Sequence, residues 1–222
     1  MSIFFIIFLM IASVVILPIV LLAIQIISAA IALKSTRKTT TEAQVPRPTV
    51  AIIVPAHNEA LGIANTIRSI QPQLSADDRL IIVADNCTDN TAQIAREHGV
   101  IVLERFNEVD RGKGFALDHG MQFLKEDPPQ VVMIIDADCE ISDSLIAQIS
   151  TQCVVMQRPV QANYVMRFYE KGGIKQQVME FAWIVKNTVR PTGYHYLGLP
   201  CQLMGTGMAF LWQDLSKCQL AS

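Results

Sequence analysis

The strongest limit on how this chain can fold comes from short apolar runs that alternate with segments of helical periodicity. Four runs rich in Ile and Val each precede a segment whose apolar residues recur at helical spacing. Continuous apolar runs between helices indicate parallel strands that are buried on both faces. The sequence therefore predicts an α/β fold with a doubly wound, mostly parallel sheet. The expected strands are 49–55, 79–85, 100–105 and 130–138, and the expected helices are 60–69, 90–97, 113–125 and 142–156.

This alternation weakens after Val160. The stretch "VQANYVMRF" (160–168) is compatible with a strand, and residues 174–189 are expected to form a long helix. The stretch "RPTGYHYLGLP" (190–200) carries two prolines and two glycines, which favours a loop. A last strand is expected within "GTGMAFLW" (205–212).

Acidic and amide residues follow three of the expected strands. They stand in "PAHNEA" (55–60), "ADNCTDNT" (84–91) and "DADCE" (136–140). In a doubly wound sheet, ligands bind in the crevice beyond the carboxyl ends of the strands. Because carboxylates near a core need a partner, one ligand shared by these strand ends is the simplest explanation.

Asp136 and Asp138 are the sharpest of these features. In an extended backbone, residues two apart point the same way, and two neighbouring carboxylates repel each other unless a cation lies between them. Hard oxygen ligands favour Mg²⁺ or Mn²⁺ bound together with substrate phosphates. For the isolated pattern, the competing interpretation is an acid cluster at a helix start before Ser142.

Two further features have a functional and an ordinary interpretation. "DRGKG" (110–114) places Arg111 and Lys113 among glycines ahead of a helix, which suits a phosphate, although such a segment is usually only a turn. Asp85 could accept a hydrogen bond from a uracil base, or it could be a structural turn residue beside a helix cap at Thr88 or Asp89. His57 is expected to be a loop histidine and not a metal ligand.

The N-terminal stretch carries no charge from Ile3 to Leu33. It exceeds the roughly 20 residues that cross a bilayer, and it lacks the basic start of a cleaved signal peptide, which is the rival interpretation. The basic residues Lys34, Arg37 and Lys38 follow it, so we expect a single-pass protein of the plasma membrane whose catalytic domain is cytoplasmic. The expected organisation is a transmembrane helix (1–33), a linker (34–48) and a folded domain (49–222).

Charge and cysteine content exclude other classes. Once the three cations after the apolar stretch are set aside, acidic residues outnumber basic ones, which argues against a nucleic-acid partner. The five cysteines are scattered and form no CxxC pair. Neither a disulfide framework nor a zinc site is therefore expected.

Taken in order, five motifs resemble the inverting family 2 glycosyltransferases of the GT-A fold. They are "VPAHNE", "ADNCTDNTAQIA", "RGKGFALDHGM", "IIDADCEI" and "GTGMAF", and they span Thr49 to about Phe210. The resemblance implies that Pro55, Ala56 and Glu59 frame the base and ribose of a nucleotide. It also implies a base-binding role for Asp85 and a place near the pyrophosphate for Lys113.

By the same resemblance, Asp136 and Asp138 form the DxD pair that holds Mg²⁺ or Mn²⁺, with Asp138 the more direct ligand and Asp136 also on the donor side. Gly205, Thr206 and Gly207 would line the acceptor side. The implied reaction moves a sugar, with inversion, from a nucleotide-diphosphate sugar, for which a UDP-sugar is favoured. The implied acceptor is a polysaccharide or a lipid-linked glycan at the cytoplasmic membrane face.

The sequence departs from the family pattern in two places. The family often has a second aspartate where Asn86 stands. The Glu-Asp pair that carries the family's general base is absent after the GTG segment, where Asp214 is the one acid. We therefore assign no catalytic residue and expect a chain truncated before that motif. The alternative is a catalytically impaired sugar-nucleotide-binding remnant or regulatory module. A sugar-1-phosphate nucleotidyltransferase ranks third, because its Gly-rich signature is missing after "VAIIVP".

Overall fold

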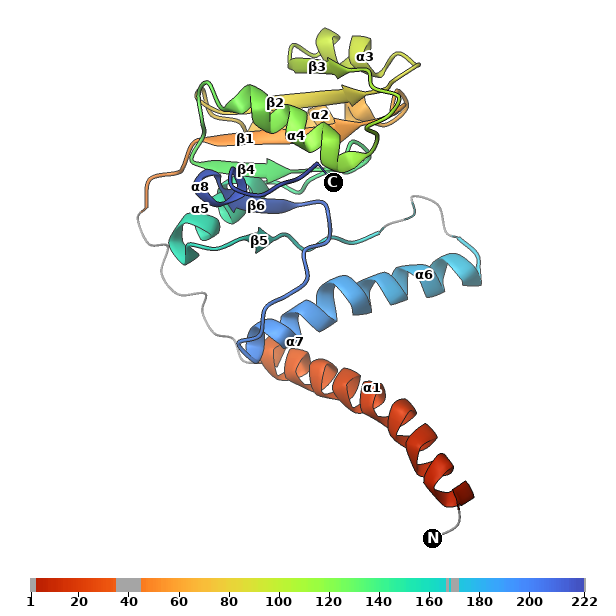
Figure 1. Ribbon diagram of the computed structural model, residues 1–222. Coiled ribbons are helices and arrows are strands. Elements are labelled where there is room, and N and C mark those ends of the chain that lie inside the picture. Colours follow the sequence, from red (N-terminus) through yellow and green to blue (C-terminus); the bar gives the residue numbers. More distant parts are fainter. Residues whose placement is uncertain (1–2, 35–44, 167, 169–171, 222) are drawn as a thin grey trace. The chain divides into compact units, whose positions relative to one another are not determined.

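The computed structural model describes residues 3–34, 45–166, 168 and 172–221 (Figure 1). The chain divides into two compact units. A sheet unit contains residues 42–162 and 203–222, and a helical unit contains residues 1–41 and 163–202. Residues 163–202, which were expected to belong to the folded domain, thus group with the N-terminal helix. Most of the expected linker lies outside the described residues.

The sheet unit is built on six strands in the order β3-β2-β1-β4-β6-β5. The pairs β1–β2, β2–β3 and β1–β4 are parallel, and β6 runs antiparallel to both β4 and β5. The expectation of a mostly parallel α/β sheet is confirmed. The strands are β1 (Val50–Ala56), β2 (Arg79–Asp85), β3 (Ile101–Arg105), β4 (Val131–Ile134), β5 (Val160–Gln161) and β6 (Met208–Leu211).

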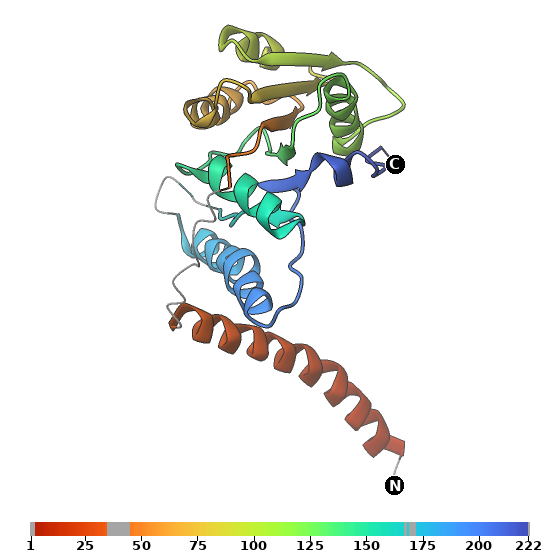
Figure 2. The same ribbon diagram turned by 90° about the vertical axis from the view of Figure 1, so that its left-hand side faces the viewer.

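Helices cover both faces of this sheet (Figure 2). Ile52 and Val54 of β1 face a core that includes residues of α2, α3 and α5, while Ile53 faces a second core with α4 and α8. The inner strands are buried on both sides because each face has its own helical layer. The helices are α2 (Ile63–Ile70), followed by the 3-10 turn η1 (Gln71–Gln73), α3 (Thr91–Glu97), α4 (Lys113–Leu124), α5 (Leu145–Met156) and α8 (Trp212–Leu215).

Several expected boundaries were wrong. Helix α2 begins at Ile63, because the backbone N–H of Gly62 first closes a turn onto the Glu59 carbonyl at 3.0 Å. Strand β4 ends at Ile134, four residues before its expected end, and the N–H of Cys139 turns back to the Asp136 carbonyl at 3.2 Å. The strand expected over 160–168 is reduced to Val160–Gln161. Asp136 and Asp138 therefore lie in a turn and not in extended backbone.

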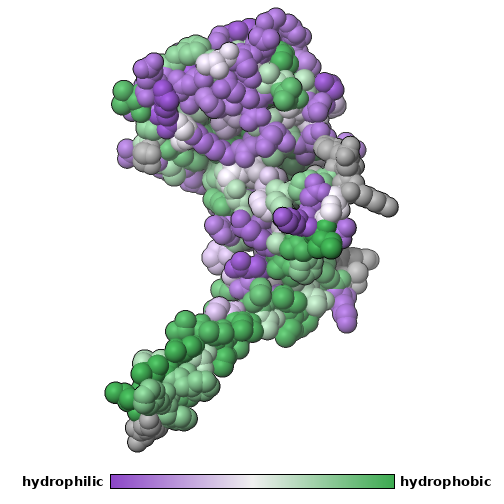
Figure 3. Space-filling model, turned by 90° about the vertical axis from the view of Figure 1, so that its right-hand side faces the viewer, coloured by the Kyte–Doolittle hydropathy of each residue, from purple (hydrophilic) through white to green (hydrophobic). Residues whose placement is uncertain are grey.

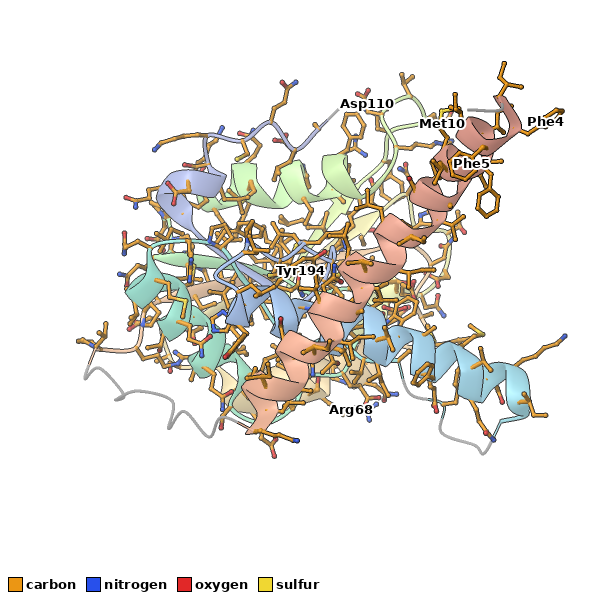
Figure 4. The ribbon with its side chains drawn as sticks, turned by 90° about the horizontal axis from the view of Figure 1, so that it is seen from below. Phe4, Phe5, Met10, Arg68, Asp110 and Tyr194 are labelled. Carbon is orange, nitrogen blue, oxygen red and sulfur yellow. The ribbon has the colours of Figure 1, made fainter. Side chains whose placement is uncertain are left out.

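The helical unit consists of α1 (Ile3–Lys34), α6 (Ile174–Ile184), the π-helix η2 (Val185–Val189) and α7 (Arg190–Tyr196). Helix α1 is long and apolar enough to cross a membrane, a property that signal sequences near an N-terminus share. Its surface is almost continuously hydrophobic (Figure 3), and Phe4, Phe5 and Met10 project from its first turns (Figure 4). The long helix expected over 174–189 is present as α6 and η2.

Helix α7 corrects the expectation of a loop at 190–200. Pro191 is tolerated in the first turn of a helix. Gly193 allows a close approach, since a Cβ at this position would lie 2.2 Å from the Gln25 carbonyl oxygen of α1. The Gln25 side chain donates to the Tyr194 hydroxyl at 2.9 Å and accepts from Arg190 at 2.8 Å. Tyr194 accordingly lies against α1 in Figure 4.

Candidate functional site

A cavity of about 240 Å³ opens at the carboxyl ends of β1, β2 and β4. The arrows of these strands end at the same edge of the sheet (Figure 1). The cavity brings together every residue that the sequence assigned to donor or metal binding. Its lining consists of Pro55, Ala56, His57, Glu59, Asp85, Lys113, Ala116, Asp136, Ala137 and Asp138.

The turn that follows β4 carries the acidic part of the cavity. One ligand atom each from Asp136, Asp138 and Cys139 lies within 4.8 Å of the others, a spacing that a metal ion could bridge. Asp138 is exposed and Asp136 is half-buried. The two carboxylates thus converge, although the backbone that presents them is turned and not extended.

Two threonines hold this turn in place. The Thr206 hydroxyl accepts from the backbone N–H of Asp136 at 2.9 Å and donates to the Cys139 sulfur at 3.6 Å. From helix α2, the buried Thr66 hydroxyl donates to the Ala137 carbonyl at 2.7 Å. The turn is therefore fixed by contacts on both sides before any ligand is present.

The donor set fits a hard cation. Burial raises the pKa of the Cys139 thiol to about 11, with the Asp138 and Asp136 carboxylates adding to the rise. The thiol is therefore protonated near neutral pH, and it donates to Asp138 at 3.6 Å. Because a protonated thiol is a poor ligand, the available ligands are the carboxylate oxygens, which suit Mg²⁺ or Mn²⁺.

Lys113 supplies a cation beside this turn. Its ammonium group is paired with the Asp136 carboxylate and donates to the Gly205 carbonyl at 2.6 Å. Gly205 and Gly207 have φ values of 91° and 64°, in the left-handed region that favours glycine. The expected acceptor-side segment thus contacts the DxD turn through Lys113 and Thr206 without lining the cavity itself.

The pKa of Glu59 reflects the excess of negative charge in the cavity. This pKa is raised, first by burial and then by the carboxylates of Asp138, Asp89 and Asp136. Such crowding of acids is costly in the absence of a counter-ion. A cation bound at the turn would relieve it.

Asp85 lies at the end of β2 with its carboxylate nearly buried. The Arg105 guanidinium donates to its Oδ1 atom at 2.7 Å, and the Asn86 amide donates to the same atom at 3.2 Å. A second cavity, of about 630 Å³, shares His57 and Asp85 with the first and extends toward Phe106 and Arg111. The His57 Nδ1 atom lies 2.7 Å from the Asp85 carbonyl oxygen.

Sequence reasoning missed three residues that support the site. Arg105 ends β3 and stands in register with Asp85, so the carboxyl-end rule applied to β3 would have found it. Thr66 carries no local signal, because only the fold brings α2 to the DxD turn. Gln161 donates to the Thr206 carbonyl at 2.8 Å and accepts from the Met204 N–H at 2.7 Å, which fixes the GTG segment.

The family is decided by a comparison with protein-family models. The model described as Glycosyl transferase family 2 matches residues 51–212, which include Asp85, Asp136, Asp138 and the GTG segment. The chain belongs to glycosyl transferase family 2. The matched residues include the strands and the turn that line the cavity described above.

Two relatives of this family 2 chain match it over only part of their own length. It is 31% identical over 129 residues to the 4,4'-diaponeurosporenoate glycosyltransferase of Staphylococcus aureus, covering 54% of this chain and 34% of that protein. It is 34% identical over 95 residues to the low-salt glycan biosynthesis hexosyltransferase Agl6 of Haloferax volcanii, covering 41% of this chain and 21% of that protein. The chain thus spans about a third or less of these two relatives.

A solved structure shows the same fold. Glucosyl-3-phosphoglycerate synthase of Mycobacterium tuberculosis, crystallised with UDP, superposes with a TM-score of 0.50 at 23% identity, over 75% of this chain and 57% of that chain. The likeness supports the GT-A fold that the motif order of this family 2 chain implies.

Proposed function

We propose that this chain transfers a sugar from a nucleotide-diphosphate sugar, with a UDP-sugar as the favoured donor. The observation that carries the proposal is the convergence of Asp85, Lys113, Asp136 and Asp138 on one cavity at the strand ends. Base, diphosphate and metal each have a chemically suitable partner there. Membership of glycosyl transferase family 2 supports the same reaction.

In this proposal, Asp136 and Asp138 hold a divalent cation. The cation supplies charge neutralisation for a diphosphate leaving group. Lys113 lies between Asp136 and the GTG segment, where its ammonium can bind a donor phosphate. Pro55, Ala56 and Glu59 frame the base and ribose, and Asp85 accepts a hydrogen bond from the base.

The acceptor is proposed to be a polysaccharide or a lipid-linked glycan at the cytoplasmic face of the plasma membrane. The apolar helix α1 supports this location, because its length and composition suit a membrane span. In this proposal, Gly205, Thr206 and Gly207, which adjoin the cavity through Lys113, serve the acceptor, and transfer proceeds with inversion. The catalytic base stays unassigned.

Calorimetric titration of UDP into the full chain in detergent, with and without Mn²⁺, tests the donor site. We expect Mn²⁺-dependent binding that Asp136→Ala and Asp138→Ala each weaken by at least about tenfold, because each removes a charge-assisted ligand. Asp143→Ala is the matched control, since Asp143 is exposed and lies outside the cavity lining. Equal UDP binding by all four proteins would mean that the DxD is an acid cluster without a metal role.

The second candidate is a sugar-nucleotide-binding module without turnover. The observation behind this candidate is that Asp214 is exposed on α8 and does not line the cavity, so it does not act as a base there. Incubation of the full chain with Mn²⁺ and UDP-sugars separates the two functions. Release of UDP that depends on Asp138 indicates a transferase, whereas tight binding without UDP release indicates a binding module.

A further inference from the structure

The two oxygens of the Asp85 carboxylate differ in their surroundings. Oδ1 accepts from Arg105 Nη1 at 2.7 Å and from Asn86 Nδ2 at 3.2 Å. A carboxylate oxygen has two lone pairs, so both acceptor positions of Oδ1 are taken. Among the described residues, Oδ2 has no hydrogen-bond partner and is not one of the fully buried unpaired atoms. Oδ2 therefore remains available to a ligand in the cavities that Asp85 lines.

The contact of Asn86 with Asp85 has a fixed direction. The Asn86 Oδ1 atom accepts from the backbone N–H of Asn107 at 2.8 Å, so the amino end of the amide must face Asp85. Asn86 has a φ of 51°, in the left-handed region, and its own N–H donates to the Arg105 carbonyl at 2.7 Å. The Asn86 donor is thus held by the β3 end and not free to rotate away.

The Arg105 side chain is itself fixed by several contacts. It is only 13% exposed, and its guanidinium lies over the Phe115 ring of α4, 5.4 Å from the ring centroid. Its Nη2 atom also donates to the carbonyl of Asp110, on the loop that follows β3 (Figure 4), at 2.7 Å. Such stacking and planar hydrogen bonding are specific to arginine. Arg105 therefore presents one fixed face of Asp85 to the cavity.

We propose that Arg105 is a specificity-determining positioning residue, which saturates one oxygen of Asp85 and leaves a single acceptor for the nucleotide base. This proposal rests on the donor-binding function above. A lone acceptor matches uracil, whose pairing edge has one N–H donor between two carbonyls. Guanine presents two adjacent donors, N1–H and the 2-amino group, which need both oxygens of a carboxylate. The second guanine donor would meet the occupied Oδ1 and stay unpaired, at a cost.

The test compares UDP, GDP and IDP as ligands of the full chain with Mn²⁺. GDP and IDP differ only in the guanine 2-amino group. In the wild type we expect UDP to bind on the order of tenfold more tightly than GDP. IDP, which lacks the unpaired 2-amino group, should bind more tightly than GDP. In Arg105→Met, Oδ1 is released, so the UDP preference should fall and GDP should bind more tightly than IDP.

Arg96→Met is the matched control. Arg96 pairs with Glu104 between α3 and β3, outside both cavities, and makes no contact with Asp85. We expect wild-type ratios of UDP to GDP and of GDP to IDP in this variant. In the Asp85→Asn background, Arg105→Met should no longer change either ratio, because the two residues act as one unit.

The outcomes separate this inference from the proposed function. A wild type that prefers GDP to IDP by about tenfold would overturn the inference even if Arg105→Met does not fold. An Arg105→Met variant that weakens all three ligands equally would also overturn it and give Arg105 a purely structural role. A folded wild type that binds no UDP would contradict the proposed function itself.

Discussion

Asn86 illustrates how one amide orients the carboxylate of the residue before it. The family pattern often has an aspartate here, and the structure shows what the amide does instead: it donates to Asp85 and accepts from Asn107. A carboxylate could accept from Asn107 but would repel Asp85. The amide at position 86 therefore forms a hydrogen bond with the Asp85 carboxylate where an aspartate would repel it.

Asn86→Asp should weaken UDP binding about tenfold, because it places a second negative charge beside Asp85 and removes one donor to its Oδ1 atom. Titration calorimetry with Mn²⁺ measures the change. Asn90→Asp is the control, since Asn90 is exposed and makes no side-chain cap hydrogen bond to α3. Unchanged UDP affinity in Asn86→Asp would show that the Asn86 amide does not shape the base contact.

The thiol of Cys153 should resist alkylation. Burial in α5 raises its pKa to about 11, so at pH 8 only about one thiol in a thousand is ionised. The fraction of reactive thiolate rises with pH until the pKa is reached. Mass spectrometry after iodoacetamide treatment at pH 8 should find Cys201 and Cys218 modified, because both are exposed, and Cys153 modified only in urea. Modification of Cys153 in the folded chain would contradict its burial.

At this scale, the sequence located the acids but not their partners. Asp85, Asp136 and Asp138 were predictable, because a buried apolar run that ends in a carboxylate is visible in one dimension. Arg105 and Thr66 were not, because their roles depend on which strand or helix lies beside the acid. The turned backbone at Asp138 was missed for the same reason: the Thr206 contact that shapes it comes from 70 positions further along the chain, measured from Asp136.

Among the elements, the strands were easier to predict than the connections after Val160. Residues buried on both faces leave an unbroken apolar run, whereas α7 carries Pro191 and Gly193, which usually indicate a loop. The structure uses both residues inside a helix, one in its first turn and one at the close approach to Gln25. Helix α7 is thus stabilised by its packing against α1, which its own composition does not indicate.

Gly120 makes a comparable close approach in the sheet unit. A Cβ at this position in α4 would lie 3.0 Å from Cγ2 of Ile53 and 3.3 Å from Cγ2 of Val83. Gly120→Val should therefore lower the free energy of unfolding by about 1–3 kcal/mol through overpacking. Urea unfolding followed by circular dichroism measures it. Gln122→Val carries the same β-branched residue at an exposed position of α4 and should be nearly neutral; equal losses in both variants would point to helix propensity alone.

At the scale of the whole molecule, the length and composition of α1 suit a membrane span. Its 32 residues exceed the roughly 20 that cross a bilayer. We expect the full chain to stay in the membrane pellet after alkaline carbonate washing, and its N-terminal peptide to be intact by mass spectrometry. Recovery in the supernatant, or cleavage within α1, would identify α1 as a signal sequence.

The antiparallel direction of β6 determines where the chain leaves the sheet unit and returns to it. The chain departs after Ala162, whose N–H donates to the Gly207 carbonyl at 2.7 Å, and re-enters at Leu203, just ahead of Gly205. Both crossings therefore lie next to the segment Gly205–Gly207, whose Thr206 hydroxyl accepts from the N–H of Asp136. The two ends of the forty-residue segment 163–202 thus leave and rejoin the sheet unit next to the residues that contact Lys113 and Asp136.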